Sequence, residues 1–240
     1  MGKRQPAPAS PKAPTQPPPD DNDSDTSFIE FETEDPMPQS PPIPRVKQPF
    51  KYYCIFDVEA TCEENDREWV HEIIEFPVVL LDSTTLETVA EFRSFVRPVF
   101  NATLTAFCTK LTGISQEQTD DAPLFVDVLA QFEDFMRTHR LTRDNMRFAC
   151  DGPWDIRDFV TKQCKLVGIP VPDYFHNHVN VRGLARKYFL TKTVSFRSGL
   201  VGMLNYFGLE FIGNQHSGID DARNIARIAV ELMRENVVFI

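Results

Sequence analysis

Two carboxylates, Asp57 and Glu59, follow the strand-like run YYCIF with only Val58 between them. Because residues i and i+2 of a strand project from one face, both side chains point to the same side. Carboxylates this close raise each other's pKa unless a cation lies between them. A hard divalent ion such as Mg²⁺, which prefers oxygen ligands, fits such a pair. Taken alone, an Asp-x-Glu pair is more commonly a solvated strand edge than a metal site.

Two further motifs bring acids to the start of a helix. ACDGPWDI places Asp151 and Asp155 after a strand-like run, with Trp154 directly before the second acid. HSGIDD puts His216 in the loop before the last helix and Asp221 in its first turn. Each has a structural interpretation as well: an N-cap, a core tryptophan, a surface histidine, or an acid that complements the helix dipole. The occurrence of all three motifs in one chain favours a catalytic metal site.

A meander of strands followed by helices is expected to position these motifs. Apolar and β-branched residues predict strands over 52–58, 72–82 and 87–98, which form an antiparallel meander, with Pro77 marking an irregularity in the second. A fourth strand is predicted over 146–151. Helical periodicity predicts helices over 103–111, 122–139, 156–168, 181–189, 198–208 and 217–235. This order indicates an α/β domain of three layers, with helices flanking a mixed central sheet.

The start of the last helix carries its own signals. Ser217 and Asp220 have the spacing of a capping box, in which the serine side chain would accept a backbone N–H. Gly218, beside His216, is expected to let the imidazole swing toward the acids.

Composition separates the first 47 residues from the rest. Residues 1–47 hold 12 of the 19 prolines and lack apolar periodicity. Such a segment buries too little surface to offset its ordering entropy, so we expect a disordered Pro-rich acidic tail over 1–47 and one domain over 48–240. The sequence shows no secretory signal, transit peptide or membrane span, and its 5 dispersed cysteines suit buried, reduced thiols. We expect a soluble protein of the cytoplasm, the nucleus or both, with no membrane partner.

The net charge of −10 bears on possible partners. A chain this acidic repels phosphates at long range, so any nucleic-acid chemistry needs a local source of positive charge. Bound metal ions are one such source. Basic residues that could hold a phosphate backbone are Arg182, Arg186, Lys187, Lys192 and Arg197. A basic run of this kind is as often a solvated helix face.

The three acidic motifs resemble those of the DEDDh exonuclease superfamily, whose RNase H-like fold gathers four acids around two metal ions. The similarity extends over roughly residues 50–235. The blocks FDVEATCEE, VHEIIEFPVVLLD, FCTKLTGI, DGPWDI and HSGIDDARNIARIAVELM resemble the Eri group of 3′-to-5′ exoribonucleases, to which the histone-mRNA 3′-exonuclease belongs.

The resemblance implies a role for each matching residue. Two Mg²⁺ ions, for which Mn²⁺ can substitute, would be held by Asp57, Glu59, Asp155 and Asp221. His216 would be the general base, with Glu59 also counted as catalytic, whereas Asp151 and Asp220 fall outside the ligand pattern. The terminal nucleotides would be bound by Glu59, Ala60, Thr61, Phe107, Leu111, Trp154 and His216. For the aromatic and leucine side chains among these, a place in the core is the alternative.

The resemblance also implies a reaction and a substrate. Two-metal-ion hydrolysis would release nucleoside 5′-monophosphates from single-stranded or short overhanging RNA 3′ ends, in ribosomal RNA 3′-end trimming or in small-RNA and RNA-silencing turnover. A single-strand deoxyribonuclease or proofreading exonuclease on the same scaffold is an alternative. A second alternative is an RNA-binding adaptor whose Pro-rich tail recruits a protein partner.

Overall fold

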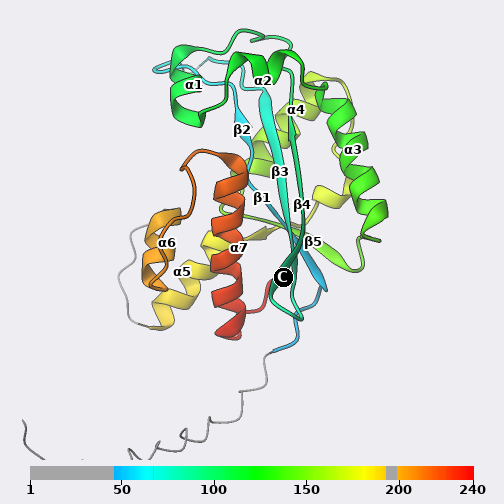
Figure 1. Cartoon of the computed structure of the whole chain (residues 1–240). Coiled ribbons are helices and arrows are strands. Elements are labelled where there is room, and N and C mark those ends of the chain that lie inside the picture. The colour runs from blue at the N-terminus through cyan, green and yellow to red at the C-terminus, as the bar shows by residue number, and fades with distance from the viewer. Residues whose placement is uncertain (1–45, 67, 193–198) are drawn as a thin grey trace, which may run out of the picture. The chain divides into compact units, whose positions relative to one another are not determined.

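The computed structural model describes residues 46–66, 68–192 and 199–240 (Figure 1). The predicted tail over 1–47 therefore lies outside the described residues, apart from Val46 and Lys47. Among the helices of the described ranges, none has both the length and the apolar character that a bilayer crossing requires.

The predicted antiparallel meander is confirmed. It consists of β1 (Tyr52–Phe56), β3 (Ile73–Asp82) and β4 (Glu87–Phe95), with β3 between the other two. β5 (Met146–Cys150) pairs with β1 in parallel, so the sheet is mixed, as expected. The short strands β2 (Glu59–Ala60) and β6 (Val179–Asn180) complete it.

The irregularity expected at Pro77 is not there. Pro77 keeps regular register opposite Arg93, and the shift in the β3–β4 ladder falls between Leu80 and Leu81 instead. On the other side of β3, pairing with β1 ends at Val78 and pairing with β2 starts at Glu75. Pro77 thus lies beside a break in the neighbouring strand, where a residue without an N–H is tolerated.

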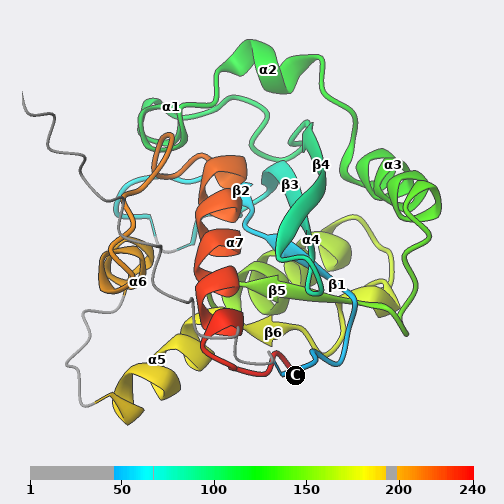
Figure 2. The ribbon, with the colours of Figure 1, turned by 60° about the horizontal axis from the view of Figure 1, so that its bottom comes forward.

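Helices cover both faces of the sheet, which confirms the three-layer α/β fold (Figures 1 and 2). Alternate residues of β1 enter two different cores, because successive side chains of a strand point to opposite faces. Tyr53 and Ile55 pack with α5 (Val181–Thr191), α6 (Leu200–Tyr206) and α7 (Gly218–Arg234).

The opposite face of β1 carries Cys54 and Phe56. These side chains pack in a core with α3 (Phe125–Thr138) and α4 (Thr161–Leu166). All ten residues of β3 are buried, as expected for a strand covered on both faces.

Two short helices lie above the β2 end of the sheet (Figure 1). α1 (Ala106–Thr112) begins three residues later than predicted because Thr105 is its N-cap, and it ends at Gly113, which has φ 71°. α2 (Gln116–Asp120) was not predicted, although Ser115 and Gln118 form a capping box at its start.

The predicted helix over 156–168 is not uniform. Asp155–Val160 forms a π-helical turn that leads into α4, and the Thr161 hydroxyl donates to the carbonyl of Ile156 at 2.9 Å. π-Helical turns occur often at functional sites, and this one begins at a predicted metal ligand.

Candidate active site and metal centre

Three acids from separate elements meet at the β2 end of the sheet. Asp57 follows β1, Glu59 begins β2 and Asp221 lies in the first turn of α7; one carboxylate oxygen of each lies within 4.8 Å of the others. Asp155, at the start of the π-helical turn, reaches the same edge, where its Oδ1 accepts the N–H of Val58 at 3.2 Å. The structure therefore brings together all four acids that the sequence singled out.

Burial strongly perturbs these carboxylates. It raises the pKa of Asp57 well above its ordinary value, and the charges of Asp155, Asp221 and Glu59 raise it further. Burial also raises the pKa of Glu59 to about 9, and those of Asp155 and Asp221 to about 7. Acids held this close in a largely buried site do not all ionise without a cation. A set of carboxylate oxygens of this kind fits a hard divalent ion.

His216 lies at the mouth of this cluster. It is exposed and has φ 63°, a conformation that few residues other than glycine adopt. A backbone hydrogen bond from His216 opposes the effect of burial on the pKa of Asp221. A pocket of about 380 Å³ is lined by His216 together with Asp57, Asp151, Arg182 and Asp221. The imidazole therefore shares one cavity with Asp57 and Asp221, two of the four predicted metal ligands.

Gly218 does not act as the expected hinge of the histidine loop. It is buried as the first residue of α7, and a Cβ at this position would lie 2.5 Å from the carbonyl oxygen of Asp57 and 3.1 Å from Cγ of Pro77. Only glycine permits α7 to approach the end of β1 this closely. This contact brings Asp221 beside Asp57.

The predicted capping box at Ser217 is wrong, because the Ser217 side chain caps nothing. The backbone N–H groups of Gly218 and Ile219 donate instead to Glu75, at 3.1 and 3.3 Å. Glu75 lies 143 residues from Gly218 in sequence. No motif of the sequence singles out Glu75, although a lone acid inside the apolar run IIEFPVVLL is a usable signal.

Comparison with known proteins identifies the architecture. Residues 54–229 match the RNase_T exonuclease family. The chain belongs to this exonuclease family. Its relatives include 3′-5′ exoribonuclease 1 of Homo sapiens, 42% identical over 188 residues that cover 78% of this chain and 53% of the relative. Another is the 3′-5′ exonuclease eri1 of Schizosaccharomyces pombe, 39% identical over 79% of this chain and 70% of the relative. The chain spans about half the length of the mammalian exoribonuclease 1 relatives.

Solved structures agree. The nuclease domain of 3′hExo, a DEDDh family member bound to rAMP, superposes with TM-score 0.75 at 40% identity, covering 80% of this chain and 96% of that one. Cell-death related nuclease 4 superposes with TM-score 0.77 at 29% identity, covering 80% and 68%. The predicted resemblance to Eri-type DEDDh exonucleases and the RNase H-like fold are both confirmed.

In this member of the exonuclease family, Asp151 is a neighbour of the acid cluster with a partner of its own. The guanidinium of Arg182 donates through Nε to Oδ1 of Asp151 at 3.1 Å and through a second nitrogen to Oδ2. Arg182 also lies over the ring of Trp154, 5.5 Å from its centroid. Asp151 is thus neutralised locally, which distinguishes it from Asp57.

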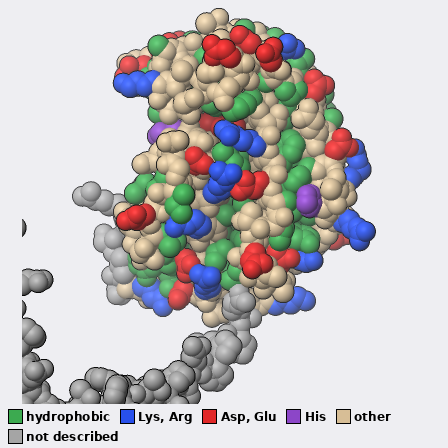
Figure 3. Space-filling model, viewed as in Figure 1, with side chains coloured by type: hydrophobic (Ala, Val, Ile, Leu, Met, Phe, Trp, Pro, Cys, Tyr) green, Lys and Arg blue, Asp and Glu red, His purple; other side chains and the backbone are tan. Residues whose placement is uncertain are grey.

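The other basic residues differ in how they are placed. Arg186 and Lys187 are exposed on α5, whereas Lys192 forms an ion pair with Glu235 at 3.7 Å. Arg197 lies outside the described residues. On the face of the exonuclease domain that carries α7, basic and acidic side chains are interspersed (Figure 3).

The predicted nucleotide-contact residues divide into two kinds. Leu111 is 37% exposed and Trp154 is 46% exposed, so neither fills the core; Phe107 is half-buried. Ala60 and Thr61 are buried, and the Thr61 hydroxyl accepts the N–H of Glu72 at 2.9 Å. The Thr61 side chain therefore supports the loop around the site.

Proposed function

We propose that this chain is a metal-dependent 3′-to-5′ exoribonuclease that releases nucleoside 5′-monophosphates. The observation that carries the proposal is the convergence of four carboxylates at one edge of the sheet, where Asp57 and Asp221 line a cavity together with His216. Relatives at 42% and 39% identity that are named 3′-5′ exoribonuclease and 3′-5′ exonuclease support it.

Each acid has a role in the proposal. Asp57, Glu59, Asp155 and Asp221 hold two Mg²⁺ ions, with Mn²⁺ as a substitute. Bound ions of this kind supply an activated water and stabilise the leaving 3′-oxygen. Because the four pKa values are raised, cation binding must displace protons, so affinity increases with pH.

His216 acts as the general base. Its exposed position at the rim of the cavity lets the imidazole accept a proton from a water above Asp57 and pass it to solvent. The cavity that it shares with Asp57 and Asp221 supports this assignment.

The substrate is the 3′ end of an RNA, single-stranded or with a short overhang. Exposed Leu111 and Trp154, with half-buried Phe107, offer apolar and aromatic surfaces for the last bases beside Glu59 and Ala60. Base stacking is tolerant of sequence, since every base has a π-face. One structural neighbour is described as recognising the 3′ end of a histone mRNA stem-loop. For the whole protein, the proposed role is ribosomal RNA 3′-end trimming or small-RNA turnover in the cytoplasm or nucleus. The proposal also includes a protein partner that binds residues 1–47.

A digestion assay tests the proposal. A 5′-labelled RNA with a 3′ overhang should shorten stepwise from its 3′ end in Mg²⁺ or Mn²⁺ and should stay intact in EDTA. Single-stranded DNA of the same sequence should be digested more slowly. Faster digestion of DNA would favour the deoxyribonuclease alternative. RNA that stays intact with both metals would favour the alternative of an RNA-binding adaptor.

A further inference from the structure

Glu75 is a buried acid that no step of the proposed reaction uses. It is 0% exposed in the middle of β3 and has three hydrogen-bond donors around its carboxylate. Nε of Arg93 donates to Oε1 at 2.7 Å, the N–H of Ile219 donates to the same oxygen, and the N–H of Gly218 donates to Oε2. Both oxygens of the carboxylate are therefore occupied.

The donors around Glu75 come from two elements that would not otherwise be tied together at this point. Arg93 lies on β4, and Gly218 and Ile219 are the first residues of α7. The free N–H groups of a helix N-terminus need an acceptor when buried, and they carry a partial positive charge. With Ser217 making no cap, an anionic carboxylate from the sheet satisfies this helix end.

The location of Glu75 links it to the acid cluster. In the β2–β3 register it is the direct partner of Glu59. The helix end that it holds is flanked by His216 on one side and Asp221 on the other, and Gly218 is packed on the carbonyl of Asp57. A shift of this helix end would move Asp221 and His216 relative to Asp57 and Glu59.

We infer that Glu75, paired with Arg93, is a positioning residue that ties the first turn of α7 to the sheet, so that Asp221 and His216 face Asp57 and Glu59. The inference rests on the proposed function, because it treats the acid cluster as a cation site. Glu75 itself touches neither substrate nor cation.

Glu75 also adds negative potential at the site. After burial and the charge of Asp221, the charge of Glu75 is the next cause that raises the pKa of Glu59, and it is a minor cause for Asp221. A potential that retains protons on these acids also attracts a divalent cation. Both effects of Glu75, on position and on potential, favour cation binding.

The test substitution is Glu75→Gln, which keeps the size of the side chain. In the amide one carboxylate oxygen becomes an NH₂ group, which cannot accept from a backbone N–H, so the end of α7 loses one acceptor. Changes to groups that orient metal ligands typically cost about 10- to 100-fold in metal affinity or activity. We expect Mn²⁺ affinity to fall within that range and kcat to fall with it, while KM for RNA stays within about twofold, because no nucleotide contact changes.

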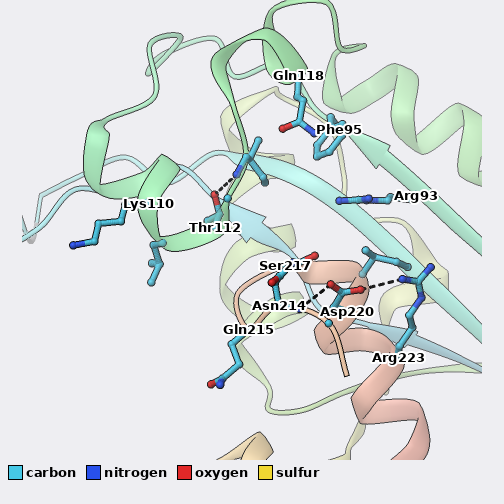
Figure 4. A pocket seen from close by; sticks show the side chains of 15 residues that line it. Arg93, Phe95, Lys110, Thr112, Gln118, Asn214, Gln215, Ser217, Asp220 and Arg223 are labelled. Carbon is cyan, nitrogen blue, oxygen red and sulfur yellow. Dashed lines mark hydrogen bonds and ion pairs between the residues drawn. The ribbon is translucent and has the colours of Figure 1, made fainter. Parts of the chain in front are cut away.

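Glu91→Gln is the matched control. Glu91 lies on the same strand as Arg93 and forms a two-pronged ion pair with Arg223 of α7, at 2.9 and 2.7 Å, yet it touches no backbone N–H of the helix end. Figure 4 shows Arg93 near the start of α7, where Asp220 of the first turn forms an ion pair with Arg223. Removing one strand-to-helix ion pair here should leave Mn²⁺ affinity unchanged.

The experiment measures Mn²⁺ binding to purified full chain by electron paramagnetic resonance of free Mn²⁺, alongside kcat and KM for RNA at saturating Mn²⁺. Weaker binding in Glu75→Gln but not in Glu91→Gln supports the inference. Equal Mn²⁺ affinity in wild type and Glu75→Gln overturns the inference, even where Glu75→Gln has a lower melting temperature than wild type. Where wild type binds Mn²⁺ but leaves RNA intact, the proposed function fails while the binding comparison still decides the role of Glu75. Absence of Mn²⁺ binding in wild type overturns both.

A second pair of variants covers the case in which Glu75→Gln does not fold. Arg93→Gln removes the side-chain donor that holds Oε1 of Glu75 at 2.7 Å, so the carboxylate is no longer fixed against the start of α7, whereas Arg93→Lys keeps a charged donor. Removing the cation alone would make the potential at the site more negative and strengthen Mn²⁺ binding, so weaker binding would report the loss of position. We expect Mn²⁺ affinity to fall in Arg93→Gln and to recover in Arg93→Lys. Equal affinity in wild type, Arg93→Gln and Arg93→Lys overturns the inference.

Discussion

The two sides of the acid cluster are built differently. On the sheet side, Asp57 directly follows β1 and Glu59 begins β2, so only Val58 separates the two acids along the chain. On the helix side, Asp221 and His216 depend on where α7 begins, which is set by Gly218 against Asp57 and by Glu75, 143 residues away in sequence. Local geometry fixes one half of the site, and long-range contacts fix the other.

This difference predicts how each side fails. Substitutions on the sheet side should remove a cation ligand and leave the rest of the fold in place. Substitutions around the start of α7 should change the distance between the two sides, so that metal binding, stability and rate change together. The variants below separate these outcomes.

The largest effect is expected from Asp57→Asn. Loss of a central carboxylate should lower exonuclease activity by more than about 10⁴-fold, because bound cations contribute several kcal/mol of charge stabilisation and each 1.4 kcal/mol is about tenfold in rate. Initial rates with labelled RNA check this, with exposed Glu64→Gln as the control. Activity within about tenfold of wild type would remove Asp57 from the ligand set.

His216→Ala is the next largest effect. General-base help is typically worth about 10²- to 10⁴-fold, so kcat should fall by that factor. Mn²⁺ binding should be retained, since the sheet side and Asp221 are unchanged. His139→Ala, in a half-buried histidine beside Phe135, is the control. An unchanged kcat, or lost Mn²⁺ binding, would contradict the assigned role of His216.

The same contrast explains which features of the fold and of the site could be predicted from the sequence. The meander, the mixed sheet and α7 were predicted to within a few residues because apolar periodicity reports them locally. The four acids and His216 were identified from motifs of two to six residues. The prediction that these residues converge followed from the family resemblance, and the folded structure was needed to verify it.

Other features depend on residues far apart and were missed. Glu75 was interpreted only as part of a strand, because its partners at the start of α7 are distant in sequence. The pair of Asp151 with Arg182 joins a strand end to α5 across 31 residues. Gly218 was assigned flexibility when its role is close packing, since a glycine in a sequence does not show whether open space or a neighbouring backbone surrounds it.

Gly218→Ala should give an intermediate effect that involves both sides. A methyl group 2.5 Å from the carbonyl oxygen of Asp57 forces α7 away from β1, which should cost about 1–3 kcal/mol in the free energy of unfolding. Mn²⁺ affinity should fall as Asp221 withdraws. Urea unfolding and Mn²⁺ titration measure the two effects. Gly199→Ala, where a Cβ meets nothing within 4 Å, should change the free energy of unfolding by less than about 0.5 kcal/mol. Equal effects of the two alanines would argue against the packing role.

The last prediction concerns pH, and it follows from acids whose pKa values burial raises to different extents. In the metal-free protein, burial raises the pKa of Asp155 and Asp221 to about 7 and that of Glu59 to about 9. In the unfolded chain such groups titrate near pH 4. Between these values the folded state binds more protons than the unfolded state, so the free energy of unfolding falls as pH rises. The fall should occur up to about pH 7 for Asp155 and Asp221 and continue to about pH 9 for Glu59.

Melting temperatures from pH 5 to pH 9 in EDTA and in saturating Mg²⁺ measure this dependence. Each group contributes at most about 1.4 kcal/mol per pH unit, which corresponds to a few degrees in a domain of this size. Mg²⁺ should flatten the curve, because a bound cation favours the charged carboxylates. Glu59→Gln should lessen the fall above about pH 7 but keep the fall below it, because Asp57, whose pKa is also raised, Asp155 and Asp221 still titrate. A melting temperature that does not change with pH in EDTA, or that falls as steeply with Mg²⁺ as without it, would contradict this interpretation. These acids would then not form a buried cluster whose charge a cation neutralises.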